Sequence, residues 1–237
     1  MSATPDITLY TFSTPNGHKI SITLEELEIP YKVRKVALSS GEHKQEWFLK
    51  INPNGAIPAI VDHSRGDFKV FESGAIMLYL CEHYDPEGKL LPKDPDLRSE
   101  TIQWIMFQIG GLGPMQLQAS HFLKWAPEAF QYSISRYVKE TRRLYSVLEN
   151  RLKDREFLVG DSLTLADIIN FTWAYSAISI NLNLDEYPNV KNWVARIEAR
   201  PAVQKGLDVP DQNSIRELRD GRAELLPVVK ERSALLL

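Results

Sequence analysis

A proline inside an apolar run is the feature that most constrains the fold of this chain. Pro58 stands in Asn52-Pro-Asn-Gly-Ala-Ile-Pro-Ala-Ile-Val-Asp62, whose second half is otherwise typical of a buried strand. Proline cannot donate a hydrogen bond to a sheet ladder, so its place there needs a special backbone. A cis Ile57–Pro58 bond would turn the chain and present the N–H and C=O of Ile57 to a ligand. Residues 52–55 alone are also ordinary turn chemistry.

A second short stretch, Phe71-Glu-Ser-Gly-Ala-Ile76, ends a predicted strand and opens a predicted helix, with Glu72 and Ser73 at the junction. A helix N-terminus offers unpaired N–H groups and a partial positive charge, which suit a carboxylate. Ser73 is also an ordinary N-cap residue. Together, the two stretches predict an anion clamp beside an exposed backbone edge, a site suited to a peptide-like ligand.

Composition excludes several classes of function. The chain has 237 residues, enough for one large or two modest domains, and 43% hydrophobic and 25% charged residues, as in soluble globular proteins. A net charge of −3 gives no reason to expect a nucleic-acid partner. No apolar run approaches the roughly 20 residues that cross a bilayer. The opening residues lack the order of a secretory signal, so the cytoplasm is the expected location.

Cysteine usage limits the thiol chemistry of the chain. Cys81 is the only cysteine, which rules out an intramolecular disulfide and a Cys-x-x-Cys redox pair. The histidines and the cysteine show no metal-ligand spacing, so no metal site is expected. If thiol chemistry takes place here, the sulfur must come from a cofactor.

Strand signals are confined to the first third of the chain. Runs rich in β-branched and aromatic residues predict strands, and apolar residues at helical spacing predict helices. The first helix is expected to turn its glutamates, including Glu26, toward solvent. The resulting order is β-α-β-α-β-β-α, that of a thioredoxin-like domain. The predicted strands are 7–12, 31–38, 56–62 and 68–71, and the predicted helices end near residue 28 or span 45–49 and 73–84.

Helical patterns dominate after a segment rich in proline and glycine, which is read as a linker. Thr164-Leu-Ala-Asp167 predicts a capping box, in which each side chain bonds the other residue's backbone N–H. Residues 110–114 predict a helix break rather than a phosphate-binding loop. The charged C-terminal residues 210–237 are compatible with a docked helix or a solvated tail. The long predicted helices are 97–110, 132–153 and 190–200.

Several motifs, taken in order, resemble the Ure2p-like and nu-class branch of the glutathione transferase superfamily. The resemblance spans most of residues 7–205. It implies an α/β thioredoxin-like N-terminal domain plus an all-α C-terminal domain. The expected divisions are a glutathione-binding domain at 1–85, a linker at 86–97, the helical domain at 98–209 and an extension at 210–237. The motifs are Thr14-Pro-Asn-Gly-His-Lys19, Gly41-Glu-His43, Asn52 to Pro58, Phe71 to Ile76, Gly110-Gly-Leu-Gly-Pro-Met115 and Arg136-Tyr137.

The same resemblance implies a glutathione site. Glutathione is expected in its reduced form as co-substrate, and as an oxidised form or two molecules per site. The implied catalytic residues are Asn16, which activates the thiol, and Thr14 close by. The implied binding residues are Asn16, His43 at the glycine end, Ile57, Glu72 and Ser73 along the γ-glutamyl-cysteinyl backbone, and Arg136 from the helical domain near a dimer interface.

The role of Asn16 has a clear physical basis. An amide N–H can donate to a thiolate without competing for its proton, and a hydrogen bond to a charged group contributes about 1.5–3 kcal/mol. With about 1.4 kcal/mol per pKa unit, such a bond moves a thiol from about 8.5 toward neutrality. Asn16 is alternatively a plain N-cap, and the hydroxyls of Ser13, Thr14 and Tyr10 compete for the role. Without the resemblance, His43 and Arg136 are ordinary surface residues.

The leading hypothesis is a glutathione-dependent thiol–disulfide oxidoreductase or peroxidase, in which a bound thiolate attacks a small disulfide or peroxide. The alternatives are a transferase that conjugates glutathione to small electrophiles, and a non-catalytic glutathione-binding regulator. The resemblance implies a homodimer, and neither nucleic acid nor membrane is expected as a partner. Five aromatic residues could line an apolar pocket or belong to the core: Trp104, Phe107, Phe122, Trp125 and Trp173.

Overall fold

The chain divides into two compact units by its internal contacts. The computed structural model describes residues 5–234. The first unit runs to Arg98 and includes Glu198–Asn213, whereas the second comprises Ser99–Ile197 and the residues from Ser214 onward. The first is built on a sheet and the second is helical, which confirms the predicted fold class.

A four-stranded mixed sheet forms the centre of the first unit. Its order is β2-β1-β3-β4, with β1 parallel to β2 and antiparallel to β3, and with β3 antiparallel to β4. The inner strand β3 is buried on both faces, which its uninterrupted apolar run requires. The two edge strands are largely exposed. The strands are β1 (Ile7–Thr11), β2 (Tyr31–Lys35), β3 (Ala59–Asp62) and β4 (Phe68–Phe71).

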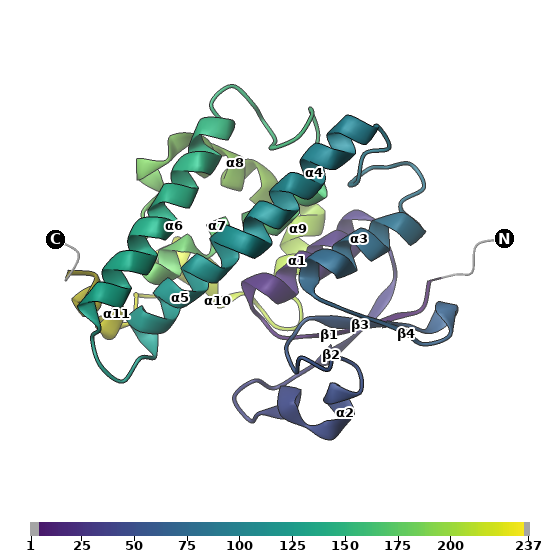
Figure 1. Cartoon of the computed structure of the whole chain (residues 1–237), viewed down its shortest axis with the longest axis horizontal. Helices are drawn as coiled ribbons and strands as arrows, with labels where there is room; N and C mark the ends of the chain where they lie inside the picture. The colour runs from purple at the N-terminus through teal and green to yellow at the C-terminus, as the bar shows by residue number, and fades with distance from the viewer. Residues whose placement is uncertain (1–4, 235–237) are drawn as a thin grey trace. The chain divides into compact units, whose positions relative to one another are not determined.

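Helices cover both faces of this sheet. α1 (Pro15–Glu26) and α3 (Ser73–Tyr84) lie on one face, and α2 (Glu46–Leu49) lies on the other (Figure 1). Phe48 of α2 is fully buried against Val36 and Ala59. The span of α3 matches the sequence prediction, and the predicted strands run one to three residues too long. Two 3₁₀ turns complete the unit, η1 (Glu42–Lys44) and η2 (His63–Arg65).

The segment Glu198–Asn213 packs with the first unit, although its sequence position suggested the helical domain. Its helix α9 (Pro201–Leu207) lies against α1, where Ser21 donates a 2.6 Å hydrogen bond to the Gly206 carbonyl. Arg200 grips Glu26 through two bonds of 2.6 and 2.8 Å. Glu26 is only 3% exposed, so the expectation that it faces solvent is wrong. Its burial is tolerated because the carboxylate is paired in bidentate geometry.

The second unit is a set of packed helices. α4 (Pro95–Phe107), the π-helical turn η3 (Gln108–Leu112) and α5 (Gly113–Lys124) form one continuous rod in Figure 1. The predicted helix break is therefore wrong: the glycine-rich segment widens the helix by a π turn and leaves it unbroken. The remaining helices are α6 (Gln131–Arg151), α7 (Leu165–Tyr175), η4 (Ala177–Ile180), η5 (Leu184–Glu186), α8 (Pro188–Glu198), α10 (Ser214–Arg219) and α11 (Pro227–Ser233).

The capping box predicted at Thr164 and Asp167 is present and starts α7. Asp167 also accepts hydrogen bonds from the Leu158 N–H at 2.8 Å and from the Trp193 indole at 3.0 Å. One buried carboxylate thus joins a helix start, a loop and α8. Of the five aromatic residues considered above, Trp173 is core at 6% exposure and Trp125 is 64% exposed.

Gly206 is expected to be the glycine least tolerant of alanine, because α9 and α1 meet there without room for a Cβ. A Cβ at Gly206 would lie 2.7 Å from the backbone of Ile22. Gly206→Ala should therefore lower the free energy of unfolding by about 1–3 kcal/mol. Gly110→Ala is the matched control, since a Cβ there meets no atom within 4 Å. Urea unfolding of both variants tests this, and equal midpoints would contradict the packing described.

Candidate functional site

One row of the sheet brings the predicted site segments together. Tyr10 of β1 pairs with Ala59 of β3, and Ala59 pairs in turn with Phe71 of β4. The turn that follows β1, the residues before β3 and the start of α3 therefore lie at the same edge of the sheet. Within this edge, the Ile57–Pro58 bond is cis, which confirms the prediction made from the sequence.

The turn after β1 is closed by a helix cap. Thr14 is the N-cap of α1, and its Oγ1 accepts a 3.1 Å hydrogen bond from the Gly17 N–H. Asn16 is the second residue of the helix, so the alternative that it serves as the N-cap is wrong. The turn is tight: a Cβ at Gly17 would lie 2.3 Å from the Phe12 carbonyl oxygen. Thr14 and Asn16 are both half-buried, at the position where a ligand would meet this turn.

Two buried basic residues follow on α1. His18 is 4% exposed, and its Nε2 lies 3.4 Å from the Ser13 hydroxyl. Burial lowers the pKa of His18 to about 4, opposed by the charge of Asp208. Lys19 is 1% exposed and donates a 3.2 Å hydrogen bond to the Ser73 hydroxyl. Burial lowers the pKa of Lys19 to about 7, and the charge of Glu72 opposes that shift.

The start of α3 carries backbone strain. Glu72 is its N-cap, with a φ of 68°, a region that non-glycine residues rarely occupy. Its side chain makes no capping hydrogen bond, and the alternative that Ser73 is an ordinary N-cap is wrong. Such strained residues persist where the surrounding structure fixes them and are concentrated at ligand-binding positions. Lys19 adds a buried amine beside this helix N-terminus, so the electrostatics favour an anion.

Lys19 is the site residue that the sequence analysis did not single out. It was quoted only as part of a motif, without a role. A signal was present: in His18-Lys-Ile-Ser-Ile22 the lysine occupies a helix whose neighbouring residues are apolar. Burial of that face makes the lysine a buried amine that requires a partner.

The turn before β3 is built around one buried side chain. Asn52 is 2% exposed, its Oδ1 accepts the Asn54 N–H at 2.9 Å, and its Nδ2 donates to the Ala56 carbonyl at 2.6 Å. Gly55 has a φ of 61°, which favours glycine. The half-buried Ile57 follows and precedes β3, outside the ladder pairings of residues 5–234. Its backbone is therefore available at the edge of the sheet.

His43 lies beside this turn, on η1. A Cβ at Gly55 would lie 2.9 Å from the His43 carbonyl oxygen, so the two segments are in close contact. The Nδ1 atom of His43 is buried and has no hydrogen-bond partner among residues 5–234. A buried polar atom without a partner costs free energy, which an added ligand group can recover.

The remaining predicted residues have simpler surroundings. The Tyr10 ring packs against Trp47 and Phe48, at 6.2 and 6.3 Å between centroids, so Tyr10 is a strand residue of the hydrophobic core. Arg136 is exposed on α6, in the second unit. Cys81 is buried, and burial raises the pKa of its thiol far above the usual value. The prediction of a chain without a usable cysteine is consistent with that environment.

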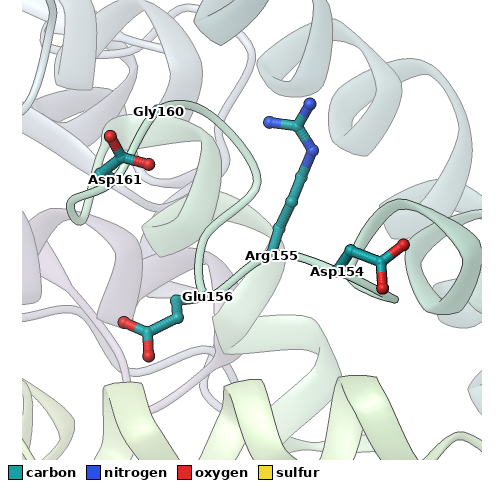
Figure 2. A pocket seen from close by; sticks show the side chains of 5 residues that line it. All are labelled: Asp154, Arg155, Glu156, Gly160 and Asp161. Carbon is teal, nitrogen blue, oxygen red and sulfur yellow. The ribbon is translucent and has the colours of Figure 1, made fainter.

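A pocket of about 500 Å³ lies elsewhere, in the loop that follows α6. Figure 2 shows the carboxylates of Asp154, Glu156 and Asp161 spread around it, with Arg155 pointing away from them. They do not converge on a point where a cation could bind. Among residues 5–234, no cluster of His, Cys, Asp or Glu side chains is placed to hold a metal ion. In the same range, none of the helices has the length and apolar character needed to span a membrane.

Family models match both units. The model of the glutathione S-transferase N-terminal domain matches residues 5–82, and that of the C-terminal domain matches residues 117–201. The chain is 45% identical over 205 residues to the disulfide-bond oxidoreductase YfcG of Escherichia coli K12, covering 85% of this chain and 94% of YfcG.

Three solved structures are also similar. A glutathione transferase homolog from Lodderomyces elongisporus, with two GSH per subunit, has a TM-score of 0.84 and 40% identity, covering 86% of this chain and 99% of its own. A Pseudomonas putida glutathione transferase with one bound glutathione disulfide has a TM-score of 0.81 and 37% identity, with coverages of 86% and 92%. Ure2p in complex with glutathione has a TM-score of 0.82 and 34% identity, with coverages of 87% and 100%.

The lowered pKa of Lys19 predicts a pH-dependent stability. Because the folded pKa is about 7 and the ordinary value is 10.5, the unfolded chain binds more protons between these pH values. Stability then rises with pH in this window, by at most about 1.4 kcal/mol per pH unit. The unfolding free energy of the wild type minus that of Lys19→Met should increase from pH 7 to pH 10 and be constant below pH 6. A difference that does not change with pH contradicts the assignment.

Proposed function

Because the chain belongs to the glutathione transferase family, in its Ure2p-like branch, we propose that it is a glutathione-dependent thiol–disulfide oxidoreductase. The observation that carries this proposal is the sheet row that brings the turn of Asn16, the cis-Pro58 edge and the start of α3 to one place. The relative with 45% identity carries the same activity in its name. The second and third of these segments would hold the peptide, and the first would hold its sulfur.

Glutathione is a tripeptide with two carboxylates, and the edge of the sheet offers matching groups. The γ-glutamyl carboxylate fits the N-terminus of α3 at Glu72 and Ser73, next to the buried amine of Lys19. The backbone of Ile57 can pair with the cysteinyl residue as an added strand would. At the glycine end, the unpartnered Nδ1 of His43 can bond the tripeptide.

The sulfur would lie at the start of α1, where Asn16 and Thr14 act on it. The Thr14 oxygen already accepts the Gly17 N–H, which leaves its hydroxyl hydrogen to donate. The Asn16 amide can donate as well, and the helix N-terminus adds a positive field. Hydrogen bonds to a thiolate of about 1.5–3 kcal/mol each lower its pKa by about one to two units.

The reaction needs no sulfur from the protein. A glutathione thiolate attacks one sulfur of a disulfide, a mixed disulfide forms, and the other sulfur leaves as a thiolate that takes a proton. A second glutathione thiolate attacks the mixed disulfide, releasing the second thiol and leaving glutathione disulfide. Two glutathiones are oxidised and one disulfide is reduced. A peroxide is reduced with the same two glutathiones, yielding an alcohol and water.

We also propose a homodimer that works in the cytoplasm, where thiols are kept reduced. Arg136 is exposed on α6, and an exposed guanidinium can reach a glutathione carboxylate. Sedimentation velocity at micromolar concentration tests the dimer, and a single species at the monomer mass of 27.1 kDa would overturn it.

Replacing Asn16 should separate catalysis from folding. Asn16→Ala removes the amide donor, so the pKa of bound glutathione should rise by about one to two units and disulfide reductase turnover should fall at least tenfold. Asn16→Asp places a negative charge at the same atoms. Aspartate is favoured in the first turn of a helix, so this variant should unfold no earlier than the wild type and yet lose turnover as well. Turnover and urea midpoints are the measurements.

The Asn16 assignment is wrong if either variant keeps wild-type turnover. A variant with lost turnover and a lower unfolding midpoint is uninformative about catalysis, which is why Asn16→Asp is paired with Asn16→Ala. Binding of S-methylglutathione, which has no ionisable thiol, should change less than threefold in Asn16→Ala.

The choice of acceptor distinguishes the oxidoreductase from a conjugating transferase. Initial rates with a glutathionyl mixed disulfide, a hydroperoxide and an aryl halide, at matched concentrations, should be highest with the disulfide. A higher rate with the aryl halide favours the conjugating enzyme. Calorimetric binding of glutathione with no turnover of any acceptor favours a regulator.

A further inference from the structure

The turn that follows β1 contains a hydrogen-bonded pair beyond Thr14 and Asn16. Ser13 is half-buried and directly precedes the N-cap, so its hydroxyl belongs to the same turn. Its Oγ lies 3.4 Å from the Nε2 of His18, one helical turn into α1. We propose that Ser13 is a second donor to the glutathione sulfur, and that His18 is the positioning residue that directs the Ser13 hydroxyl. This inference rests on the proposed function.

The direction of the hydrogen bonds follows from their relative strengths. A hydroxyl has one hydrogen to donate and two lone pairs that accept. A thiolate is charged, and bonds to a charged acceptor are roughly twice as strong as neutral ones. The Ser13 hydrogen is therefore directed to the sulfur. The remaining lone pairs face His18, which completes the arrangement when its Nε2 carries the hydrogen.

His18 is suited to this role because it is buried and stays neutral. At 4% exposure it is shielded from water, and the lowered pKa keeps the ring uncharged at physiological pH. A neutral imidazole has one donor and one acceptor nitrogen, so its tautomer adapts to its partner. His18 thus orients Ser13 without adding a charge that titrates near pH 7.

The segment Glu198–Asn213 holds His18 in place from the other side. Asp208 interacts electrostatically with His18, and its Oδ1 accepts a 3.1 Å hydrogen bond from the Asn213 N–H. The next acidic residue, Asp211, pairs with Lys35 of β2 at 2.5 Å. The charged groups that face His18 are therefore Asp208 from this segment and, on α1 itself, Lys19. This explains what the returning segment supplies to the site.

A thiolate titration on the full chain tests the proposal. The ultraviolet absorbance of the thiolate reports the pKa of bound glutathione in wild type, Ser13→Ala, His18→Phe and the double variant. Ser13→Ala should raise that pKa by about one unit and lower turnover about tenfold at pH 7. His18→Phe should have a smaller effect of the same sign, and the double variant should equal Ser13→Ala alone, because His18 acts through Ser13.

Ser40→Ala is the matched control, since Ser40 is exposed and bonds only the Ala37 carbonyl within its own turn. If Ser13→Ala titrates like Ser40→Ala, Ser13 is not a donor. If the effects of Ser13→Ala and His18→Phe are additive, His18 does not act through Ser13. If the wild type itself binds no glutathione, or binds it with the pKa of free thiol, the proposed function fails.

One measurement needs no substitution. The ¹⁵N shifts of His18 in the glutathione complex should report the Nε2–H tautomer, unchanged between pH 5.5 and 9. The Nδ1–H tautomer would overturn the proposed direction of the Ser13 bond, even where His18→Phe does not fold.

Discussion

The site depends on a single cross-strand row, because Tyr10, Ala59 and Phe71 pair side by side in the sheet. Three segments, separated by up to 60 residues in sequence, leave or enter the sheet at this row. A slip of one residue would turn every side chain of a strand to the opposite face. Because β3 is buried on both faces, its burial holds the row in register. The binding edge is thus a consequence of how the core packs.

A buried lysine connects this edge to the helices. Lys19 reaches Ser73 from α1, across the space between α1 and α3. Burying an amine is costly, and the strained backbone of Glu72 adds to that cost. Two unfavourable features at one helix start are expected where a site is prepared for a ligand. An anion would offset both, since it would pair with the amine and meet the N–H groups of α3.

Features that depend on local backbone chemistry were predictable from the sequence. The cis-Pro58 bond, the capping box at Thr164 and the span of α3 each follow from a few neighbouring residues. Features that depend on distant partners were not. The pattern of α1 indicated neither the burial of Glu26 nor that of Lys19, because Arg200 and Ser73 lie 174 and 54 residues away. Periodicity shows which face is apolar, but it does not show which polar residue finds a buried partner.

Borrowing the sulfur changes what the protein must provide. A protein cysteine would be left oxidised after each cycle, whereas glutathione leaves with its oxidation state and is replaced. The buried Cys81, whose thiol pKa is raised, is kept out of this exchange. The site must then admit two glutathiones in sequence and release them as one disulfide. Similar structures with two GSH per subunit, or with one glutathione disulfide, contain the two states that such a cycle requires. Directional donors on a rigid helix start suit this cycle, because they stabilise either incoming thiolate without forming a bond that must later be broken.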